Sequence, residues 1–147
     1  VHHYTEMAQN QGITLATHLE PDLPPVWADE HYLDRVLFNL MANSLEATPA
    51  GGHIDISARQ SNLEGAPALE IIVSDTGCGI EVKNLANLFE KYRQRGSYRA
   101  GGSGLGLYIC KTVIAAHHGK IWAASQPGQG TQMHLLLPIG ELSLGTR

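Results

Sequence analysis

The sequence predicts a single domain of the α+β class, and three observations support this prediction. The chain has 147 residues, a length at which one hydrophobic core is the usual arrangement. Hydrophobic residues make up 43% and charged residues 16% of the chain, which is the composition of a folded domain and not of a disordered one. Segments of two-residue apolar periodicity alternate with segments of three- to four-residue periodicity, so strands and helices are mixed along the chain.

The first half of the chain is predicted to form a strand, a helix and two more strands. Residues 13–19 alternate apolar and polar side chains and then meet a proline-rich loop, which indicates a strand followed by a break. A helix is expected from Asp29 to about Pro49, because apolar residues recur at helical steps. These residues are Leu33, Val36, Leu37, Leu40, Met41 and Leu45. Residues 53–60 and 68–75 are expected to be strands, the second of them covered on one or both faces.

The second half is predicted to contain two helices and two strands. A short helix is expected over residues 82–92, followed by a polar, basic, glycine-rich stretch that predicts a mobile loop over 93–104. Helical spacing returns from Leu105 and stops at Gly119. Residues 120–125 and 131–138 are expected to be strands, and residues 140–147 lack a core pattern and are expected to form a tail.

Charge and cysteine content exclude several classes of protein. The net charge of −4 does not provide the positive field that nucleic acids require, so no nucleic-acid partner is expected. The two cysteines, Cys78 and Cys110, form no CxxC pair, which argues against a zinc site or a disulfide scaffold. No run of 18 apolar residues and no signal peptide is present, so we expect a cytoplasmic location and no membrane contact from this chain. The chain begins without Met, so it is expected to be part of a longer protein, to which any membrane anchor would belong.

The segment GGSGLGL, residues 101–107, is the densest chemical signal in the sequence. Glycines in front of a helix expose backbone amides at the positive end of the helix dipole, which favours phosphate binding. The alternative is a flexible linker that ends in a helix. A P-loop is excluded because Leu107 and Tyr108 stand where Lys and Ser or Thr are needed, and no register supplies GxGxxG.

A second glycine turn, DTGCGI, follows the strand that ends at Asp75. A carboxylate at that place accepts a hydrogen bond from an exocyclic amine, the group that distinguishes adenine from guanine. The alternative is an Asp that only stabilises its own turn. Asn39 and Asn43 lie four residues apart on one helix face, and an Asn oxygen is a suitable Mg²⁺ ligand, although each is also an ordinary helix-surface residue.

Taken in order, five segments resemble the N, G1, F, G2 and G3 boxes of sensor histidine kinases, within the GHKL ATPases that include gyrase, MutL and a heat-shock chaperone. The segments are NLMANSLEA, DTGCGI, LFEKYR, GGSGLGL and GQGT. The resemblance extends from Asn39 to Thr131. It implies a Bergerat-type fold, which is a two-layer α/β sandwich whose mixed sheet is packed on one face by helices, with a mobile lid over ATP.

The resemblance also implies roles for individual residues. Asp75 is expected to hold the adenine amine, Gly77 and Gly79 to let the base lie against the backbone, and Thr131 to support that end of the site. Asn43 is expected to carry Mg²⁺. The catalytic set is Asn39, Asn43, Lys91 and Arg93, and Phe89 is expected to anchor the lid. The other residues expected to contact ATP or ADP are Ile80, Tyr92, Gly102, Ser103, Gly104, Leu105, Gly106 and Leu107.

The implied activity is transfer of the γ-phosphoryl group of Mg·ATP to a histidine on a separate dimerisation domain, of the same protein or of its dimer mate. A response regulator would then receive the group. Hydrolytic relatives resemble one another in an ExxxN pattern whose Glu activates water. The corresponding residue here is Asn39, and an amide does not take up a proton at neutral pH, so the resemblance favours a kinase over an ATPase.

The sequence departs from the family pattern at two points. No acceptor motif is present, so residues 1–12 are expected to be a linker remnant, residues 13–139 the catalytic domain, and the chain a monomer. His2 and His3 are expected to be remnants of the end of the acceptor helix or of a linker. Glu46 stands where many relatives carry Lys, so phosphate neutralisation would depend on Lys91 and Arg93. Two alternatives therefore stay open: a non-catalytic nucleotide-sensing module, and an ATPase in which Glu46 acts as base through water. His117 and His118 are assigned to the last helical turn, where a partial positive charge suits the dipole.

Overall fold

A computed structural model describes residues 2–26, 28–90 and 106–139. It contains four helices and five strands within these ranges. In chain order they are α1 (His2–Asn10), β1 (Thr14–Leu19), α2 (Glu30–Ala47), β2 (His53–Leu63), β3 (Ala66–Asp75), α3 (Val82–Leu85), α4 (Gly106–Ala116), β4 (Lys120–Ser125) and β5 (Thr131–Pro138).

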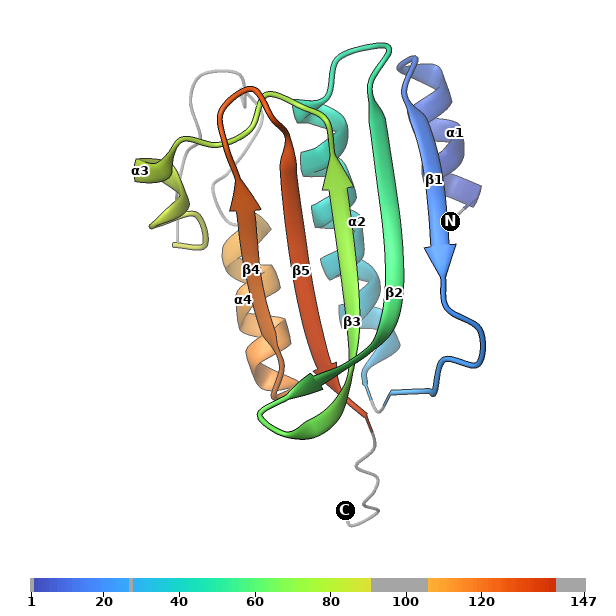
Figure 1. Ribbon diagram of the computed structural model, residues 1–147, viewed down its shortest axis with the longest axis vertical. Coiled ribbons are helices and arrows are strands. Elements are labelled where there is room, and N and C mark those ends of the chain that lie inside the picture. Colours follow the sequence, from blue (N-terminus) through green and yellow to red (C-terminus); the bar gives the residue numbers. More distant parts are fainter. Residues whose placement is uncertain (1, 27, 91–105, 140–147) are drawn as a thin grey trace.

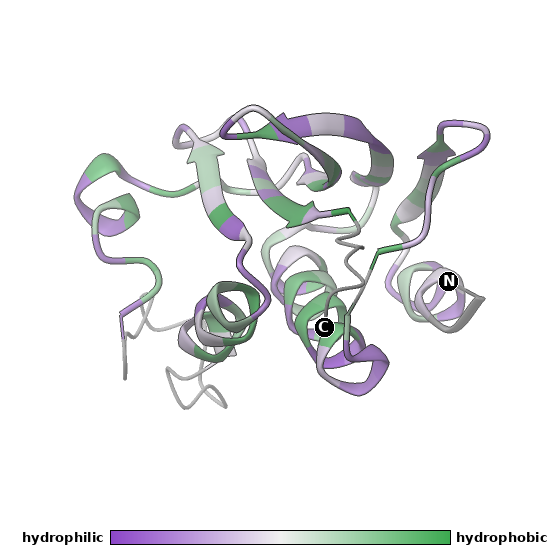
Figure 2. Cartoon of the chain, turned by 90° about the horizontal axis from the view of Figure 1, so that it is seen from below, coloured by the Kyte–Doolittle hydropathy of each residue, from purple (hydrophilic) through white to green (hydrophobic). Residues whose placement is uncertain are grey.

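The strands form one mixed sheet in the order β1-β2-β3-β5-β4 (Figure 1). β1 is parallel to β2, and every other neighbouring pair is antiparallel. The helices α1, α2 and α4 lie on one face of this sheet, and Figure 2 shows the two layers from below. The prediction of a two-layer α/β sandwich with helices on one face is therefore confirmed.

The hydrophobic core lies between the helices and the sheet. The apolar stripe of α2 faces inward, and Leu40 is fully buried there. Ile114 of α4 and Val73 of β3 are also fully buried. Burying side chains of this size stabilises a fold by about 1.5–3 kcal/mol each. This gain explains why apolar residues spaced three and four apart predict α2 and α4 correctly.

The N-terminal segment forms a helix that packs on the main core. Ala8 of α1 is fully buried, and Tyr4 and Met7 pack against the same core cluster. Burial and the nearby Asp34 carboxylate of α2 raise the pKa of Tyr4. The segment expected to be a linker remnant thus contains ordered structure, while the division of the chain at residue 12 stays a prediction.

Three element boundaries differ from the predicted ones. β2 and β3 continue into a hairpin closed by Glu64 and Gly65, both with positive φ, as a tight two-residue turn requires. The helix expected over 82–92 ends at Leu85 and is followed by turns. α4 ends at Ala116, one residue before His117.

His117 forms hydrogen bonds through both of its ring nitrogens. Its Nε2 accepts the backbone N–H of Asp29 at 3.0 Å, so that nitrogen carries no proton. Its Nδ1 lies 2.9 Å from the carbonyl oxygen of Val113, so Nδ1 carries the proton and donates it. His117 therefore ties the end of α4 to the start of α2, where the Asp29 carboxylate caps the helix by accepting from the N–H groups of His31 and Tyr32.

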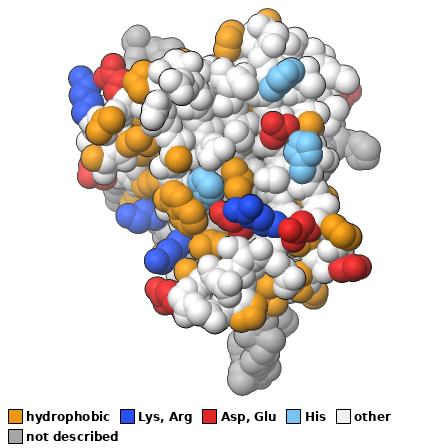
Figure 3. Space-filling view, in the orientation of Figure 1, with side chains coloured by type: hydrophobic (Ala, Val, Ile, Leu, Met, Phe, Trp, Pro, Cys, Tyr) orange, Lys and Arg blue, Asp and Glu red, His pale blue; other side chains and the backbone are white. Residues whose placement is uncertain are grey.

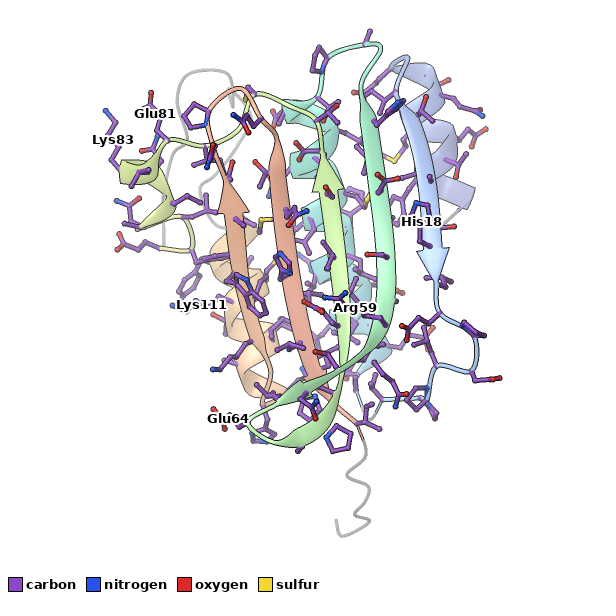
Figure 4. All side chains as sticks on the ribbon, viewed as in Figure 1. His18, Arg59, Glu64, Glu81, Lys83 and Lys111 are labelled. Carbon is purple, nitrogen blue, oxygen red and sulfur yellow. The ribbon has the colours of Figure 1, made fainter. Side chains whose placement is uncertain are left out.

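The face of the sheet that carries no helix has charged and His side chains among hydrophobic ones (Figure 3), and several of the polar side chains contact one another across strands. Glu70 of β3 is 6% exposed, and its Oε1 accepts from Arg59 Nε of β2 at 2.8 Å, with Arg59 in front of the sheet in Figure 4. Its Oε2 lies 3.1 Å from Nδ1 of His134 on β5, and the His134 ring stacks on Trp122 of β4 with centroids 4.9 Å apart. These contacts join four neighbouring strands.

No helix in the described ranges is long and apolar enough to cross a membrane.

Candidate functional site

The candidate site lies at the edge of the sheet where β3 and β4 end and β5 begins. Asp75 pairs with Thr131 in the β3–β5 ladder, and Thr131 pairs with Ser125 in the β4–β5 ladder. Directly paired side chains lie on the same face of a sheet, which here is the helix-covered face. Three oxygen-bearing side chains thus form a row at the sheet edge.

Two glycine-containing segments are held together beside this row. Gly128 N–H donates to the carbonyl oxygen of Cys78 at 2.7 Å, which joins the loop after β4 to the turn after β3. A Cβ on Gly79 would overlap the carbonyl of Gln126, and Gly79 also has a φ of +77°. The expectation that Gly79 lets a base lie against the backbone stays a prediction, while contact between the two segments already requires glycine there.

Gly77 brings the same turn against the end of α2. A Cβ at this residue would overlap the carbonyl of Ala47, and the next residue, Cys78, donates its backbone N–H to that carbonyl at 3.2 Å. The turn is thereby fixed to α2 on one side and to the loop after β4 on the other. The predicted role of Gly77 at a base is untested, and its packing role is sufficient reason for a glycine.

Asp75 stabilises its own turn. Its side chain is buried, with 7% of the residue exposed, and Oδ1 accepts from Gly77 N–H at 2.8 Å. The alternative interpretation, that this aspartate stabilises its own turn, therefore agrees with the structure. A carboxylate has about four acceptor positions, so this bond leaves the role in amine recognition compatible with the geometry.

Ser125 is the hydrogen-bonding centre of the row. Its Oγ accepts the backbone N–H of Ile80 at 2.8 Å and donates to the carbonyl oxygen of Gly130 at 2.8 Å. Its third contact is with Oγ1 of Thr131 at 2.9 Å. One hydroxyl thus holds the turn after β3, the loop after β4 and the first residue of β5 in register.

Six of the predicted nucleotide-binding residues line one cavity between the sheet edge and the helices. They are Asn43, Asp75, Gly79, Ile80, Leu107 and Thr131. The remaining lining residues are Ser44, Ala47, Leu88 and Met133. The enclosed space is about 20 Å³, room for about one water molecule, so a purine base enters only if the lining side chains move apart.

A wider groove of about 500 Å³ lies on the other side of Asp75 and Thr131. It is lined by polar groups of the loop after β4, including Gln126 and Gln129, and by Leu85 of α3. Asp75, Thr131 and Ser125 line this groove as well.

Asn39 and Gly106 meet at the helix side of the site. A Cβ on Gly106, the first described residue of α4, would lie 3.4 Å from Oδ1 of Asn39. Asn39 also hydrogen-bonds Cys110, whose Sγ donates to the carbonyl of Val36 at 3.7 Å. Burial raises the pKa of Cys110 to about 12, although the Asn39 contact opposes this, so the thiol stays protonated and unreactive.

Several predicted residues lie outside the described ranges. They are Lys91, Tyr92, Arg93, Gly102, Ser103, Gly104 and Leu105. Phe89, the expected lid anchor, is half-buried and packs against the core cluster. Within the described ranges no group of three His, Cys, Asp or Glu residues is arranged to hold a metal ion.

Sequence reasoning missed Ser125 and Leu88 as site residues. Ser125 occupies an inward position of β4, after Ile121 and Ala123, and a polar residue at that position, three residues before the GQGT segment begins, was an available signal. Leu88 is 2% exposed and lines the cavity, but a leucine in an amphipathic segment carries no signal that separates core from site.

The family model for histidine kinase-, DNA gyrase B-, and HSP90-like ATPases matches residues 28–141. The chain belongs to this family. Among curated proteins it is 34% identical over 137 residues to the adaptive-response sensory kinase SasA of Microcystis aeruginosa, covering 92% of this chain and 35% of that protein. It is 39% identical over 127 residues to the alginate biosynthesis sensor protein KinB of Pseudomonas aeruginosa, covering 86% of this chain and 20% of that protein.

Solved structures of histidine kinases have the same fold. The mycobacterial sensor histidine kinase MprB superposes with a TM-score of 0.78 at 28% identity, covering 93% of this chain and 89% of that chain. Full-length ShkA in complex with AMPPNP gives a TM-score of 0.77 at 30% identity, covering 93% of this chain and 28% of that chain. The chain thus spans about a third or less of the curated relatives it matches, and it is homologous to their kinase catalytic domains.

Proposed function

We propose that the chain is the ATP-binding catalytic domain of a two-component sensor histidine kinase. The observation that carries the proposal is the single cavity shared by Asn43 of α2, Asp75 of β3, Leu107 of α4 and Thr131 of β5. These residues come from four separate segments of the sequence, and each is among the residues that the sequence predicts to bind the nucleotide. Family membership and the AMPPNP complex of ShkA support the same assignment.

The chemistry of the lining fits Mg·ATP. Asp75 supplies an acceptor for the adenine amine, and Ile80 and Leu107 supply apolar walls for the ring. Asn43 supplies an amide oxygen, the hard ligand that Mg²⁺ accepts beside phosphate oxygens and water. Bound Mg²⁺ would neutralise charge on the phosphates. The narrowness of the cavity means that binding includes separation of the apolar lining, so we expect Leu88 and Leu107 to move.

The proposed reaction is phosphoryl transfer to a histidine of a separate acceptor domain. A ring nitrogen of that histidine attacks the γ-phosphorus, the bond to the bridging oxygen breaks, ADP leaves, and the ring proton passes to solvent. Lys91 and Arg93, with the amides of residues 102–106, are proposed to stabilise the phosphate charge. The chain would orient ATP and exclude water, and a response regulator would be the final acceptor.

The environment of Asn39 supports a kinase over a hydrolytic ATPase. Within the described part of the chain, its recorded contacts are Gly106 and a Cys110 thiol that stays protonated, and neither of these is a proton acceptor for water. Glu46, the alternative base, is exposed and does not line the cavity. A nucleotide-sensing module without activity is the remaining alternative, and transfer assays distinguish it.

The decisive experiment offers γ-labelled ATP to the chain with and without an acceptor domain of a sensor histidine kinase supplied in trans. We expect no label on the chain alone and label on the acceptor domain. Binding of ATP without transfer would support the nucleotide-sensing module instead. Steady-state phosphate release by the chain alone, lost in Glu46→Gln, would support an ATPase.

A further inference from the structure

The hydrogen bonds around Ser125 determine which way the Thr131 hydroxyl points its proton. A serine hydroxyl has one proton and two lone pairs. The backbone N–H of Ile80 occupies one lone pair of Ser125 Oγ. The carbonyl oxygen of Gly130, 2.8 Å away, only accepts, so this contact takes the single Ser125 proton. The remaining contact, with Thr131 Oγ1 at 2.9 Å, must therefore use the proton of Thr131.

The opposite assignment is unfavourable. If Ser125 gave its proton to Thr131, two oxygen lone pairs would face each other at 2.8 Å across the Ser125–Gly130 contact. Gly130 is buried and Ser125 is half-buried, so leaving the Gly130 carbonyl without its hydrogen bond carries a cost. The Thr131 hydroxyl is thus held as a donor to Ser125 and presents only lone pairs elsewhere.

We propose that Ser125 is a positioning residue that turns Thr131 into a pure acceptor beside Asp75, so that the site selects purine nucleotides with an amino group at ring position 6, such as ATP. This inference rests on the proposed function, because it assumes that a nucleotide binds at this row. Thr131 and Asp75 are paired across β3 and β5, so two acceptors lie side by side. An amine offers two donors to such a pair, whereas a carbonyl at the same ring position offers only repulsion.

The test compares binding of ATP with binding of inosine triphosphate, which carries a carbonyl in place of the amine. We expect the wild-type chain to prefer ATP strongly. In Ser125→Ala the Thr131 hydroxyl is free to rotate and donate to the carbonyl, so the ratio of the two affinities should fall about tenfold. Ser57→Ala, a serine on the opposite face of β2, is the matched control and should keep the wild-type ratio.

A double-mutant cycle separates positioning from a structural effect. Loss of the Ile80 and Gly130 contacts lowers stability and weakens both nucleotides alike, so it leaves the ratio unchanged. If Ser125 acts through Thr131, the Ser125→Ala substitution should have no further effect on the ratio in a Thr131→Val background. An equal fall in both backgrounds would overturn the proposal, as would an unchanged ratio in Ser125→Ala.

Ser125→Cys provides the same test should the alanine variant fail to fold. The thiol is similar in volume but a weak donor and acceptor, so it should also lower the ratio. A wild-type chain that binds neither nucleotide would contradict the proposed function itself. A wild-type chain that binds ATP and inosine triphosphate equally well would contradict only the inference about Ser125 and Thr131.

Discussion

Asp75 illustrates how one side chain serves both the fold and the proposed site. Its Oδ1 accepts from Gly77 N–H and so shapes the turn, while the residue lines both the narrow cavity and the outer groove. A substitution that keeps the turn bond but changes the remaining hydrogen-bonding capacity separates these roles. Asparagine does this, because its carbonyl oxygen accepts as the carboxylate does and its NH₂ group donates.

Asp75→Asn should therefore leave the fold intact and weaken ATP binding at least tenfold, since a donor would face the adenine amine. Isothermal titration calorimetry measures the affinity, and thermal unfolding reports the stability. Asp22→Asn is the matched control, because Asp22 is exposed and follows β1 at the end of that strand that lies away from the site. Equal ATP affinities of Asp75→Asn and wild type would show that the adenine amine does not bind to this residue.

Asn43→Ala should reduce mainly the part of ATP affinity that depends on Mg²⁺. Asn43 lines the cavity, and its amide oxygen is the proposed metal ligand. Titrations with ATP in the presence of Mg²⁺ or of EDTA should differ less for the variant than for the wild-type chain. An unchanged difference would place the metal on other residues.

At the scale of elements, the strands are linked on the open face by Glu70. Burial raises the pKa of Glu70, but hydrogen bonds from Arg59 and His134, together with their charges, lower it by more, so the pKa lies below its ordinary value. A carboxylate with a lowered pKa stabilises the fold above its ordinary pKa, and this contribution is lost as the pH falls through the lower folded value. The contacts join β2, β3 and β5, so their loss weakens the sheet as a unit.

Glu70→Gln should lower the free energy of unfolding by about 1–3 kcal/mol at neutral pH. The difference from wild type should shrink as the pH falls from the ordinary pKa of a glutamate through the lowered pKa of folded Glu70. Urea unfolding across this range measures it. Glu64→Gln is the control, since the ion pair of Glu64 with Lys120, at 3.8 Å, lies between exposed side chains. A pH-independent difference would mean that the charge of Glu70 does not contribute.

The elements also show what the sequence could and could not predict. α2 and α4 were predicted because their apolar residues are spaced for burial against a sheet. α1 was not, although Tyr4, Met7 and Ala8 have helical spacing, because nine residues are too few to be helical without tertiary contacts. The packing roles of Gly77 and Gly79 were not predictable, since the overlaps that exclude a Cβ there come from segments distant in sequence. The bond from Ile80 N–H to Ser125 was not predictable for the same reason, because the two residues are 45 positions apart.

Ala8→Asp should lower the free energy of unfolding by about 2 kcal/mol or more, because it buries a charge without a partner in the core. Gln9→Asp places the same side chain on the exposed side of α1 and should cost much less. Urea unfolding of both variants compares them. Similar losses in the two variants would show that α1 does not pack on the domain in solution.

At the scale of the whole molecule, the helices cover one face of the sheet and the proposed site occupies one edge of it. Residues far apart in the sequence reach that edge because β3 and β4 end there, β5 begins there, and α2 and α4 pack behind it. The family resemblance selected these residues from motif order alone. The narrowness of the cavity was not predictable, because it depends on how Leu88 and Leu107 fill the space.

A crystal structure of the chain with a non-hydrolysable ATP analogue and Mg²⁺ tests the central claim most directly. We predict that the adenine amine lies within hydrogen-bonding distance of the Asp75 carboxylate, that Asn43 binds Mg²⁺, and that the phosphates lie toward Gly106 at the start of α4. The inner cavity should be wider than in the present structure. Adenine bound in the outer groove against Leu85 and Gln129, without contact to Asp75, or no bound nucleotide at all, would contradict the account.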